Sequence, residues 1–400
     1  MGSGGREHAL AWKLAAGSGV ELHAAPGNPG IARLGECHPV RADDAEALLG
    51  LARGLAADLA VIGPEAPLVA GVADELRHMG VAVFGPGRAA AQIEGSKSFA
   101  KEVMRAAGVA TARTLEVARP PCVVKVDGLA AGKGVFVCRT AAEVDAALTA
   151  AAGFEGPLVI EELLVGEEVS LFALTDGRDV VALPPARDFK RIGDGDTGPN
   201  TGGMGSVAPA AALPAEQVEE VLDAVHRPVV RELARRDAPF VGLLFAGLML
   251  TENGLRVLEF NCRFGDPETQ SILPLLRGDL LEALSAAATG DLAGVQFEAP
   301  ANAAVTVVLA TGGYPAQGDA GTPIHGVEDA EATGALVFHA GTALRDGMLV
   351  TSGGRILNVT GVADTVAEGR DAAYAACGRI SFEGPQLRRD IGARTVATAP

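Results

Sequence analysis

The chain of 400 residues carries a formal net charge of −17 at pH 7, and 48% of its residues are hydrophobic. This length exceeds what one core usually supports, so we expect a globular protein of two to four domains. The acidic balance argues against a nucleic acid or an anionic membrane as a partner, because both are bound through basic patches. No apolar run approaches the roughly 18 residues that a membrane span requires.

Short apolar strands alternate with helices over the first part of the chain. Residues 58–63 and 81–85 have the composition of buried strands, and each ends at a glycine. This alternation predicts a doubly wound parallel sheet, whose ligands bind at the carboxyl ends of its strands. Loops rich in glycine or proline should lie at that edge, and they cover residues 2–7, 26–30 and 63–65. A strand should precede the first of these loops, so we expect the first strand of the sheet to be missing.

A helix over residues 89–107 leads into a strand-rich region. The predicted strands cover residues 122–126, 134–138, 157–162, 168–174 and 179–183. The segment 128–134 consists of small residues and one lysine, so its backbone N–H groups could cradle phosphates. It fails the P-loop spacing, and an ordinary glycine-rich hairpin remains an alternative.

The polar segment 194–205 predicts a functional surface loop. A helix over residues 215–236 should follow, and then a hairpin whose strands cover 241–250 and 255–260. Strands near 304–309, 335–339 and 355–359 predict a C-terminal α/β unit.

The second hairpin strand ends in the most informative pattern of the chain. Side chains two apart on a strand share a face, so Glu259 and Asn261 can offer two oxygens to one cation. Magnesium prefers such hard ligands and usually arrives with nucleotide phosphates. Arg263 follows on the same face, and its planar fork suits a carboxylate or a phosphate. The pattern therefore indicates phosphoryl chemistry on an acidic substrate.

Lysine is scarce, since the chain has 27 Arg and only six Lys. Four of these lysines lie in segments flanked by glycine or aspartate: Lys97, Lys125, Lys133 and Lys190. An ammonium group binds phosphate as a compact point charge, which a guanidinium does not reproduce. We therefore interpret these four positions as phosphate or substrate contacts, although any one of them could be retained by chance.

Cysteine and histidine give weaker indications. The five cysteines form no CxxC pair, which favours reduced thiols and a cytoplasmic location. The seven histidines show no spacing typical of metal ligands. His8 lies beside candidate site residues, but we interpret it as a packing or helix-start residue.

Eight segments in order resemble the phosphoribosylamine–glycine ligase family of the ATP-grasp superfamily. They are GGREHALAW, APGN, GPEAPLVAGV, EGSKSFAK, VKVDGLAAGKGV, VIEELLVGEEVS, DFKRIGDGDTGPNTGGMG and LEFNCRFGDPETQ. The resemblance implies that ATP phosphorylates glycine and that 5-phosphoribosylamine attacks the acyl phosphate, giving glycinamide ribonucleotide, ADP and phosphate. Such an enzyme acts mainly by positioning its substrates and neutralising charge.

The resemblance also implies the residues of the site. Those expected at ATP are Lys97, Lys125, Gly132, Lys133, Gly134, Glu161, Glu162, Leu163 and Glu168, with the loop around Lys133 as a lid and Glu168 at the ribose. Those expected at the other substrates are Gly4, Gly5, Arg6, Glu7, Asn28, Pro64, Glu65, Asn200 and Asp266. The catalytic set is Arg263, Lys133, Asp188 and Lys190, and Glu259 with Asn261 would hold Mg²⁺ or Mn²⁺.

The expected architecture is α/β and multidomain. An N-terminal doubly wound domain should cover residues 1–88, an ATP-grasp domain 89–292 with a lid subdomain near 112–172, and an α+β domain 296–400. The chain departs from the family pattern in two respects. The first strand is expected to be missing, and Arg187 stands where a glutamine is expected. We expect a monomer.

Three other functions compete with this interpretation. An NAD-dependent oxidoreductase is disfavoured because the glycine-rich start lacks the third glycine of the dinucleotide fingerprint. A purine-pathway carboxylase or formyl transferase of the ATP-grasp superfamily is disfavoured by the RFGDPETQ and DTGPNTGGMG segments. A non-catalytic remnant that only binds ligand remains open, because the first strand is expected to be missing.

Overall fold

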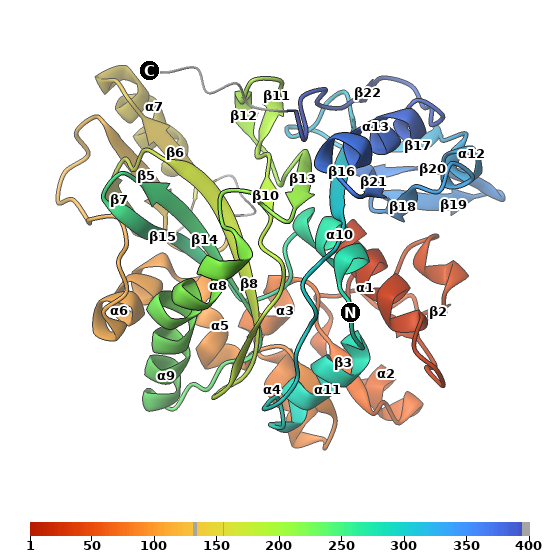
Figure 1. Ribbon diagram of the computed structural model, residues 1–400, viewed down its shortest axis with the longest axis horizontal. Coiled ribbons are helices and arrows are strands. Elements are labelled where there is room, and N and C mark those ends of the chain that lie inside the picture. The colour runs from red at the N-terminus through yellow and green to blue at the C-terminus, as the bar shows by residue number, and fades with distance from the viewer. Residues whose placement is uncertain (131–133, 155, 394–400) are drawn as a thin grey trace.

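The computed structural model describes residues 1–130, 134–154 and 156–393. Figure 1 shows the C-terminal segment, in blue, above the N-terminal helix α1, and a small sheet of β5, β6 and β7 at the upper left. No helix among the described residues is long and apolar enough to cross a membrane.

The N-terminal segment is a parallel α/β unit, as the sequence predicts. Strand β1 pairs with β2 and strand β3 with β4, both in parallel. Met1 and Gly2 lie between the two pairs, because the Met1 ammonium donates to the Val61 carbonyl over 2.7 Å and the Gly2 N–H donates to the Ala25 carbonyl over 2.7 Å. The elements are α1 (Gly5–Ala15), β1 (His23–Ala24), η1 (Ile31–Arg33), β2 (Glu36–Cys37), α2 (Ala45–Leu55), β3 (Leu59–Val61), α3 (Glu65–Ala70), α4 (Val72–His78) and β4 (Ala82–Phe84).

The prediction of a loop over residues 2–7 is wrong for its second half. Helix α1 begins at Gly5, and Gly4 is its N-cap residue. The Glu7 carboxylate accepts a 2.6 Å hydrogen bond from the Gly4 N–H, which satisfies a backbone donor that the helix itself leaves free. Behind this turn lies an apolar cavity of about 420 Å³, lined among others by Leu10, Leu14, Leu22, Leu55, Leu59 and Leu281.

The central segment contains two antiparallel sheets. The small sheet has the order β6-β5-β7 and packs against α7, and the large one has the order β15-β14-β8-β9. The helix predicted over 89–107 is two helices, because Ser96 adopts an extended backbone and caps α6 by accepting from the Phe99 N–H. The elements up to β9 are α5 (Arg88–Gly95), α6 (Lys97–Ala107), β5 (Cys122–Val126), β6 (Val135–Cys138), α7 (Ala141–Ala151), β7 (Leu158–Glu162), β8 (Glu167–Asp176) and β9 (Val180–Ala182).

The loop predicted over residues 194–205 contains regular structure. Strand β12 lies within it and forms a hairpin with β11, which ends directly before it, while β10 and β13 flank this hairpin and join the C-terminal sheet. The predicted helix 215–236 is helical throughout 215–235 but contains a π-helical turn, η2. The remaining central elements are β10 (Arg187–Asp188), β11 (Arg191–Gly193), β12 (Thr197–Asn200), β13 (Gly205–Ala208), α8 (Ala215–Val221), η2 (Leu222–His226), α9 (Arg227–Arg235), β14 (Val241–Thr251), β15 (Gly254–Asn261), α10 (Glu268–Ile272), η3 (Leu273–Leu275) and α11 (Leu280–Thr289).

The C-terminal segment contains both sheets and helices. Its main sheet has the order β10-β13-β16-β21-β18, with β22 beside β16, and a second sheet has the order β17-β20-β19. The elements are β16 (Ala303–Thr311), β17 (Asp319–Pro323), α12 (Val327–Glu331), β18 (Leu336–His339), β19 (Thr342–Arg345), β20 (Met348–Gly353), β21 (Arg355–Ala363), α13 (Val366–Cys377) and β22 (Pro385–Gln386).

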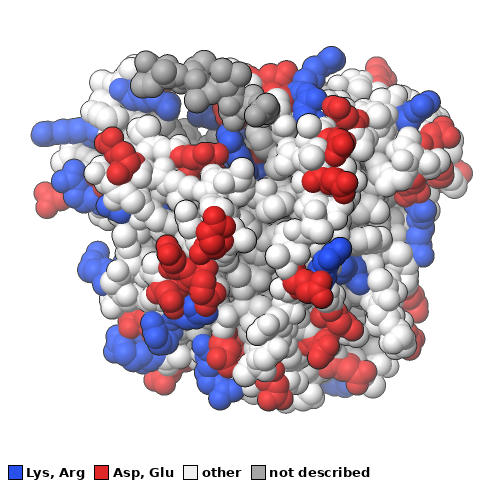
Figure 2. Space-filling model, in the orientation of Figure 1, with Lys and Arg blue, Asp and Glu red and all other residues white. Residues whose placement is uncertain are grey.

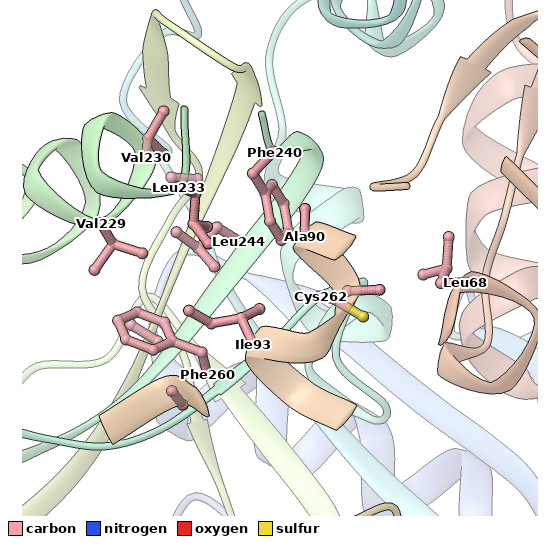
Figure 3. Packing of buried hydrophobic residues seen from close by; sticks show 14 of the residues in the cluster. Leu68, Ala90, Ile93, Val229, Val230, Leu233, Phe240, Leu244, Phe260 and Cys262 are labelled. Atoms are coloured by element: carbon pink, nitrogen blue, oxygen red, sulfur yellow. The ribbon is translucent and has the colours of Figure 1, made fainter. Parts of the chain in front are cut away.

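One hydrophobic cluster joins the N-terminal segment to the large central sheet. Figure 3 shows Ile93 of α5, Leu233 of α9, Leu244 of β14 and Phe260 of β15 packed together. These side chains are at most 2% exposed. The helices that carry the candidate site are therefore fixed to the strand that ends in Glu259 and Asn261.

The visible surface in Figure 2 mixes acidic and basic side chains. Some acids over α8 and η2 are paired within the chain, since Arg227 forms ion pairs with Glu219 and with Asp223.

Candidate active site

The site is built around the end of β15. Phe260 points into the core (Figure 3), so Glu259 and Asn261 on either side of it point to the opposite face of the sheet. Gly247 of β14 lies directly opposite Glu259 in the register, so this position of the neighbouring strand offers no second acid. The two side chains thus present one carboxylate and one amide oxygen, the kind of oxygen ligands that magnesium accepts.

Cations surround Glu259. Burial raises the pKa of Glu259, but Lys190, Lys125, Lys97 and Arg263 together outweigh burial and leave this pKa below its usual value. The Lys190 ammonium lies 3.8 Å from the Glu259 carboxylate. Three of the four lysines singled out in the sequence therefore converge on the acid at the end of β15, and this arrangement suits the charge of nucleotide phosphates.

Lys125 is held by a buried ion triplet. Glu161, which is 2% exposed, pairs with Lys125 over 2.7 Å and also with Lys101. Lys125 donates further to the Leu258 carbonyl over 2.9 Å, and Lys101 donates to the Ala112 carbonyl over 2.6 Å. The Glu161 carboxylate is therefore an internal counter-ion that places Lys125, and not a solvated group at a strand edge.

Lys97 stands at the first turn of α6. Its ammonium donates to the Gly128 carbonyl over 2.9 Å. Asp127, which follows β5, accepts hydrogen bonds from the Lys97 and Ser98 N–H groups and so caps this helix. Asp127 thereby ties the small sheet to the helix that carries Lys97.

A cluster of three further acidic residues faces the end of β15, and its members come from β8, β10 and α10. Lys190 pairs with Glu168, and Glu268 is buried at 3% exposure. Burial raises the pKa of Asp188 to about 8; Lys190 opposes this rise, while the charges of Glu268, Glu168 and Glu259 add to it. Burial also raises the pKa of Glu268. A cation bound at Glu259 and Asn261 would offset the negative charge of these acidic residues.

Arg263 links the N-terminal segment to the end of β15. Its guanidinium lies 3.0 Å from Glu94 and 3.4 Å from Glu65, and it donates to the Asn261 Oδ1 over 3.2 Å. Burial lowers the pKa of Arg263, but Glu94 and Glu65 overcompensate and raise this pKa above its usual value. The guanidinium is thus oriented by two carboxylates from different helices, α3 and α5.

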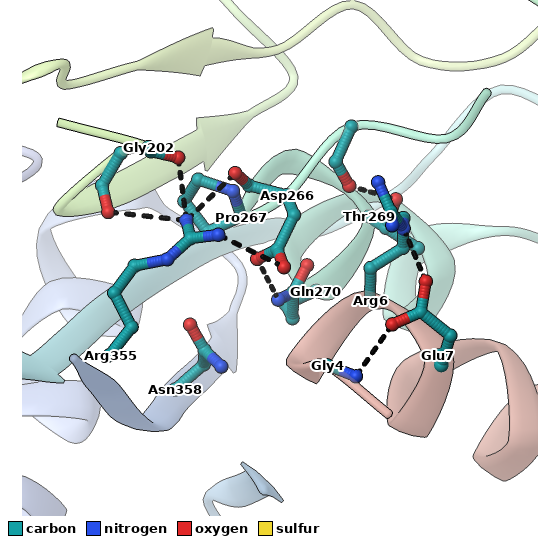
Figure 4. Close-up of polar contacts among 12 residues, drawn as sticks. Gly4, Arg6, Glu7, Gly202, Asp266, Pro267, Thr269, Gln270, Arg355 and Asn358 are labelled. Carbon is teal, nitrogen blue, oxygen red and sulfur yellow. Dashed lines mark hydrogen bonds and ion pairs between the residues drawn. The ribbon is translucent and has the colours of Figure 1, made fainter. Parts of the chain in front are cut away.

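The first turn of α1 lies next to this arginine. Figure 4 shows Glu7 between the Gly4 N–H and the Arg6 guanidinium, which it meets over 2.6 Å. Arg6 also donates to the Phe264 carbonyl over 3.1 Å. An 11-residue helix whose N-terminus holds an arginine can bind an anionic group through backbone N–H donors and charge.

Arg355 of β21 closes the site from the C-terminal segment. It donates to the carbonyls of Gly202 and Asp266 over 2.5 and 2.9 Å, and pairs with the Asp266 carboxylate over 3.2 Å (Figure 4). The Asp266 carboxylate also accepts from Gln270 over 2.8 Å. Residues 202, 266 and 355, which are far apart in the sequence, therefore meet at this arginine.

The other residues singled out in the sequence are less central. Asn28 uses its amide within the fold, donating to the Ser3 and His339 carbonyls and accepting from the Gly30 and Ile31 N–H groups. Arg187 pairs with Glu167 over 3.3 Å. The rest are placed as follows: Gly5 and Gly134 are buried, Pro64 is the N-cap of α3, Glu162 pairs with Arg113, Leu163 follows β7, Asn200 ends β12, and Gly132 and Lys133 lie outside the described residues.

Sequence reasoning missed four residues that organise the site: Glu94, Lys101, Asp127 and Arg355. Lys101 is one of the six lysines, and Glu94 and Asp127 lie in the segments quoted for Lys97 and Lys125, so a signal was present for these three. Arg355 is one arginine among 27, and only the path of β21 brings it to the site.

Most of the chain matches models of one family. The phosphoribosylglycinamide synthetase N domain matches residues 1–94, its ATP-grasp (A) domain 95–269 and its C domain 304–394. The phosphoribosylamine–glycine ligase of Rhizobium meliloti is 48% identical over 99% of this chain and 98% of its own, and that of Streptomyces coelicolor is 49% identical over 98% of both. The crystal structure of the Thermotoga maritima phosphoribosylamine–glycine ligase superposes with a TM-score of 0.85 at 36% identity, over 98% of both chains.

These matches confirm the predicted resemblance, the multidomain α/β architecture and the class of ATP-dependent ligase. The chain belongs to the phosphoribosylglycinamide synthetase family of ATP-grasp ligases.

Proposed function

We propose that this protein joins glycine to 5-phosphoribosylamine at the expense of ATP, through a glycyl phosphate. One glycine carboxylate oxygen attacks the γ-phosphorus and ADP leaves. The sugar amine then attacks the acyl carbon, and phosphate leaves with that glycine oxygen while the amine loses a proton. Family membership supports the overall reaction, and the ring of cations around Glu259 is the observation in the fold that supports phosphoryl transfer at this place.

The cation ligands are Glu259 and Asn261. Both offer hard oxygens on one face of β15, which suits Mg²⁺ or Mn²⁺. A bound divalent ion would neutralise phosphate charge there. Lys97 and Lys125 contact the phosphates in this proposal, and Gly132, Lys133 and Gly134 belong to the segment that covers them. The ion triplet of Lys101, Glu161 and Lys125 fixes one of these ammonium groups before ATP arrives.

The nucleoside binds between the small and the large sheet. The backbone from Glu161 to Leu163 faces adenine, and Glu168 holds the ribose. Burial of the Glu161 side chain supports a contact through its main chain only. Glu162 donates its N–H to the Arg113 carbonyl, so Leu163, the first residue past β7, is the better hydrogen-bonding candidate.

Phosphoribosylamine and glycine bind on the other side of β15. The N-terminus of α1, with Gly4, Gly5 and Arg6, suits the sugar phosphate. Arg263 is the group that best suits the glycine carboxylate, because Glu65 and Glu94 already fix its orientation. Asp188 and Lys190 are proposed at the acyl phosphate, and the remaining substrate contacts are assigned to Glu7, Asn28, Pro64, Glu65, Asn200 and Asp266.

The proposed organisation keeps the boundaries expected from the sequence: 1–88, 89–292 with a lid at 112–172, and 296–400. We also propose a cytoplasmic monomer. All five cysteines are free thiols, as a reducing compartment would keep them. Light scattering on the purified chain tests the monomer directly.

The decisive assay measures ADP release with each substrate omitted in turn. The proposal requires rapid ADP release only when glycine and phosphoribosylamine are both present. A protein that only binds its ligands, the alternative left open by the sequence, would bind nucleotide but release no ADP in response to the two substrates.

A further inference from the structure

A second cluster of ligand-type side chains lies at the edge of the N-terminal sheet, far along the chain from β15. Strands β1 and β2 are parallel partners, and their register places His23 directly beside Glu36. His38 follows two residues after Glu36 and so lies on the same face. Cys37, between them, points to the other face, where its thiol meets the Asn28 carbonyl at 3.9 Å. The fold therefore brings together two imidazoles and a carboxylate whose sequence spacing gave no such signal.

The three side chains are close enough to share one ion. The His23 Nδ1 lies 3.0 Å from the His38 Nε2 and 3.8 Å from the Glu36 carboxylate, and one ligand atom from each residue lies within 4.8 Å of the others. Tetrahedral zinc holds imidazole nitrogens at about 2.0–2.1 Å, which puts neighbouring ligand atoms roughly 3.3 Å apart. Small side-chain rotations would bring the observed separations to that value.

A fourth residue orients the first imidazole. The Glu21 carboxylate lies 3.2 Å from the His23 Nε2. A proton held there by Glu21 leaves the His23 Nδ1 with a free lone pair that faces His38 and Glu36. In zinc sites a carboxylate commonly accepts a hydrogen bond from the outer nitrogen of a histidine ligand, and this contact fixes the orientation of the ring.

We propose that His23, Glu36 and His38 bind a divalent transition-metal ion of the zinc type, separate from the cation of the ATP site. Two imidazoles select against Mg²⁺, which prefers oxygen ligands. The histidine side chains are 19% and 16% exposed, and Glu36 is 67% exposed, so solvent reaches the cluster and leaves a position for water. The inference does not depend on the proposed function.

A bound ion would link the two ends of the loop formed by residues 25–35. Its ligands come before and after residues 25–35, which include Asn28 and the short helix η1. Asn28 donates to the His339 carbonyl, so this loop also contacts the C-terminal segment. A ligand that binds the folded state and crosslinks the base of a loop raises thermal stability.

The test is a calorimetric titration of the untagged full chain with Zn²⁺ in excess Mg²⁺, together with its melting temperature. We expect one Zn²⁺ per chain and a higher melting temperature, and Co²⁺ should give the visible absorption of a tetrahedral site. His23→Gln and His38→Gln should each abolish this binding. Glu21→Gln changes a residue that contacts His23 but not the ion, and it should weaken binding by about tenfold.

Two controls separate this site from others. His78→Gln removes an exposed histidine of the same segment and should bind Zn²⁺ as the parent does. Glu259→Gln alters the proposed ATP-site cation and should also leave the stoichiometry unchanged. Glu36→Gln, at an exposed position, tests the cluster if a histidine variant fails to fold.

Absence of saturable Zn²⁺ binding by the parent chain would overturn the proposal. So would binding that persists in Glu36→Gln and in the two histidine variants, because the ion would then be held elsewhere.

Discussion

The residue on which the catalytic proposal depends most is Glu259. Glu259→Gln keeps the shape of the side chain but removes the charge at the centre of four cations. We expect turnover to fall on the order of 100-fold or more, since misplacement of reacting groups has such an effect. The melting temperature should change little, because Glu259 is partly exposed.

The matched control is Glu252→Gln, an exposed acid in the turn of the same hairpin. It should have parental turnover. Near-parental ADP release by Glu259→Gln at saturating Mg²⁺ would remove Glu259 from the cation site.

Glu161 offers a stability test of the ion triplet. Glu161→Gln leaves two buried ammonium groups, Lys101 and Lys125, without their shared counter-ion. Removal of one partner from a buried ion pair costs about 3–5 kcal/mol, so the urea midpoint should fall clearly. Its neighbour Glu162 pairs with the exposed Arg113 over 3.6 Å, and Glu162→Gln should cost less than about 1 kcal/mol. Equal urea midpoints for the two variants would contradict the assignment.

His226 makes the fold sensitive to acid. Burial lowers the pKa of His226 to about 4, although the nearby Leu171 and Leu244 carbonyls oppose this effect. Its side chain is 0% exposed, and neither ring nitrogen meets hydrogen-bond geometry with any described residue. Because the folded pKa lies below the unfolded value of about 6.5, protonation favours the unfolded chain between these two pH values.

The corresponding measurement is urea unfolding at pH 7.5 and pH 5. His226 should contribute a loss of about 2 kcal/mol in the free energy of unfolding over this interval, and nothing further above pH 7.5. His226→Leu should lose this part of the pH dependence. Burial also lowers the pKa of His8 to about 3 and the pKa of His339 to about 4, and the contributions of these two residues should remain. An identical pH dependence in parent and variant would show that His226 is not buried in neutral form.

At the scale of single residues, the sequence predicted what strand alternation controls. Glu259 and Asn261 share a face because Phe260 between them must be buried. The scarcity of lysine identified Lys97, Lys125 and Lys190. Neither strand alternation nor the scarcity of lysine identifies an ion-pair partner that is distant in the sequence. The Arg263 pairs with Glu65 and Glu94, and the Arg355 pair with Asp266, depend on how elements pack, which a single sequence does not encode locally.

At the scale of elements, the N-terminal cavity leads to a prediction. Met1 and Gly2 occupy only the end of the space between β1 and β3, and the cavity of about 420 Å³ behind them is lined mostly by aliphatic side chains. Burial lowers the pKa of the Met1 ammonium, which therefore lies in an unfavourable environment. An apolar strand of about six residues added ahead of Met1 should enter this space and replace the ammonium by a peptide N–H.

Each aliphatic side chain buried in that cavity contributes roughly 1.5–3 kcal/mol, so the melting temperature should rise by several degrees or more. An added Gly-Ser segment of equal length is the control and should have no such effect. Equal melting temperatures for the two extended chains would show that the cavity does not accept a strand.

Most elements could be predicted because their apolar runs are long and their ends are marked. The strands around 122–126, 158–162, 241–251 and 254–261 are examples. The polar segment 194–205 predicts a loop because strand β12 within it has almost no apolar side chains. Strands β10 and β13 are short. Strand β10 pairs with β13 and β13 pairs with β16, so each gains a partner that its own sequence does not indicate.

At the scale of the whole molecule, the site lies where all three segments meet. The N-terminal helix α1, the residues that follow the central strand β15 and the C-terminal strand β21 each contribute an arginine: Arg6, Arg263 and Arg355. The C-terminal sheet also takes in β10, whose Asp188 faces the site. The three segments therefore form one site together. Replacement of one of these three arginines should also alter substrate binding by the residues of the other two segments.

The central claim is that one site forms a glycyl phosphate and then transfers the glycyl group to the amine. Glycine labelled with ¹⁸O in its carboxylate tests this claim most directly. The proposed sequence predicts that each inorganic phosphate carries one ¹⁸O from glycine and that the amide product keeps the other. Phosphate that contains no label, with both labelled oxygens lost to water or retained in glycine, would contradict the account.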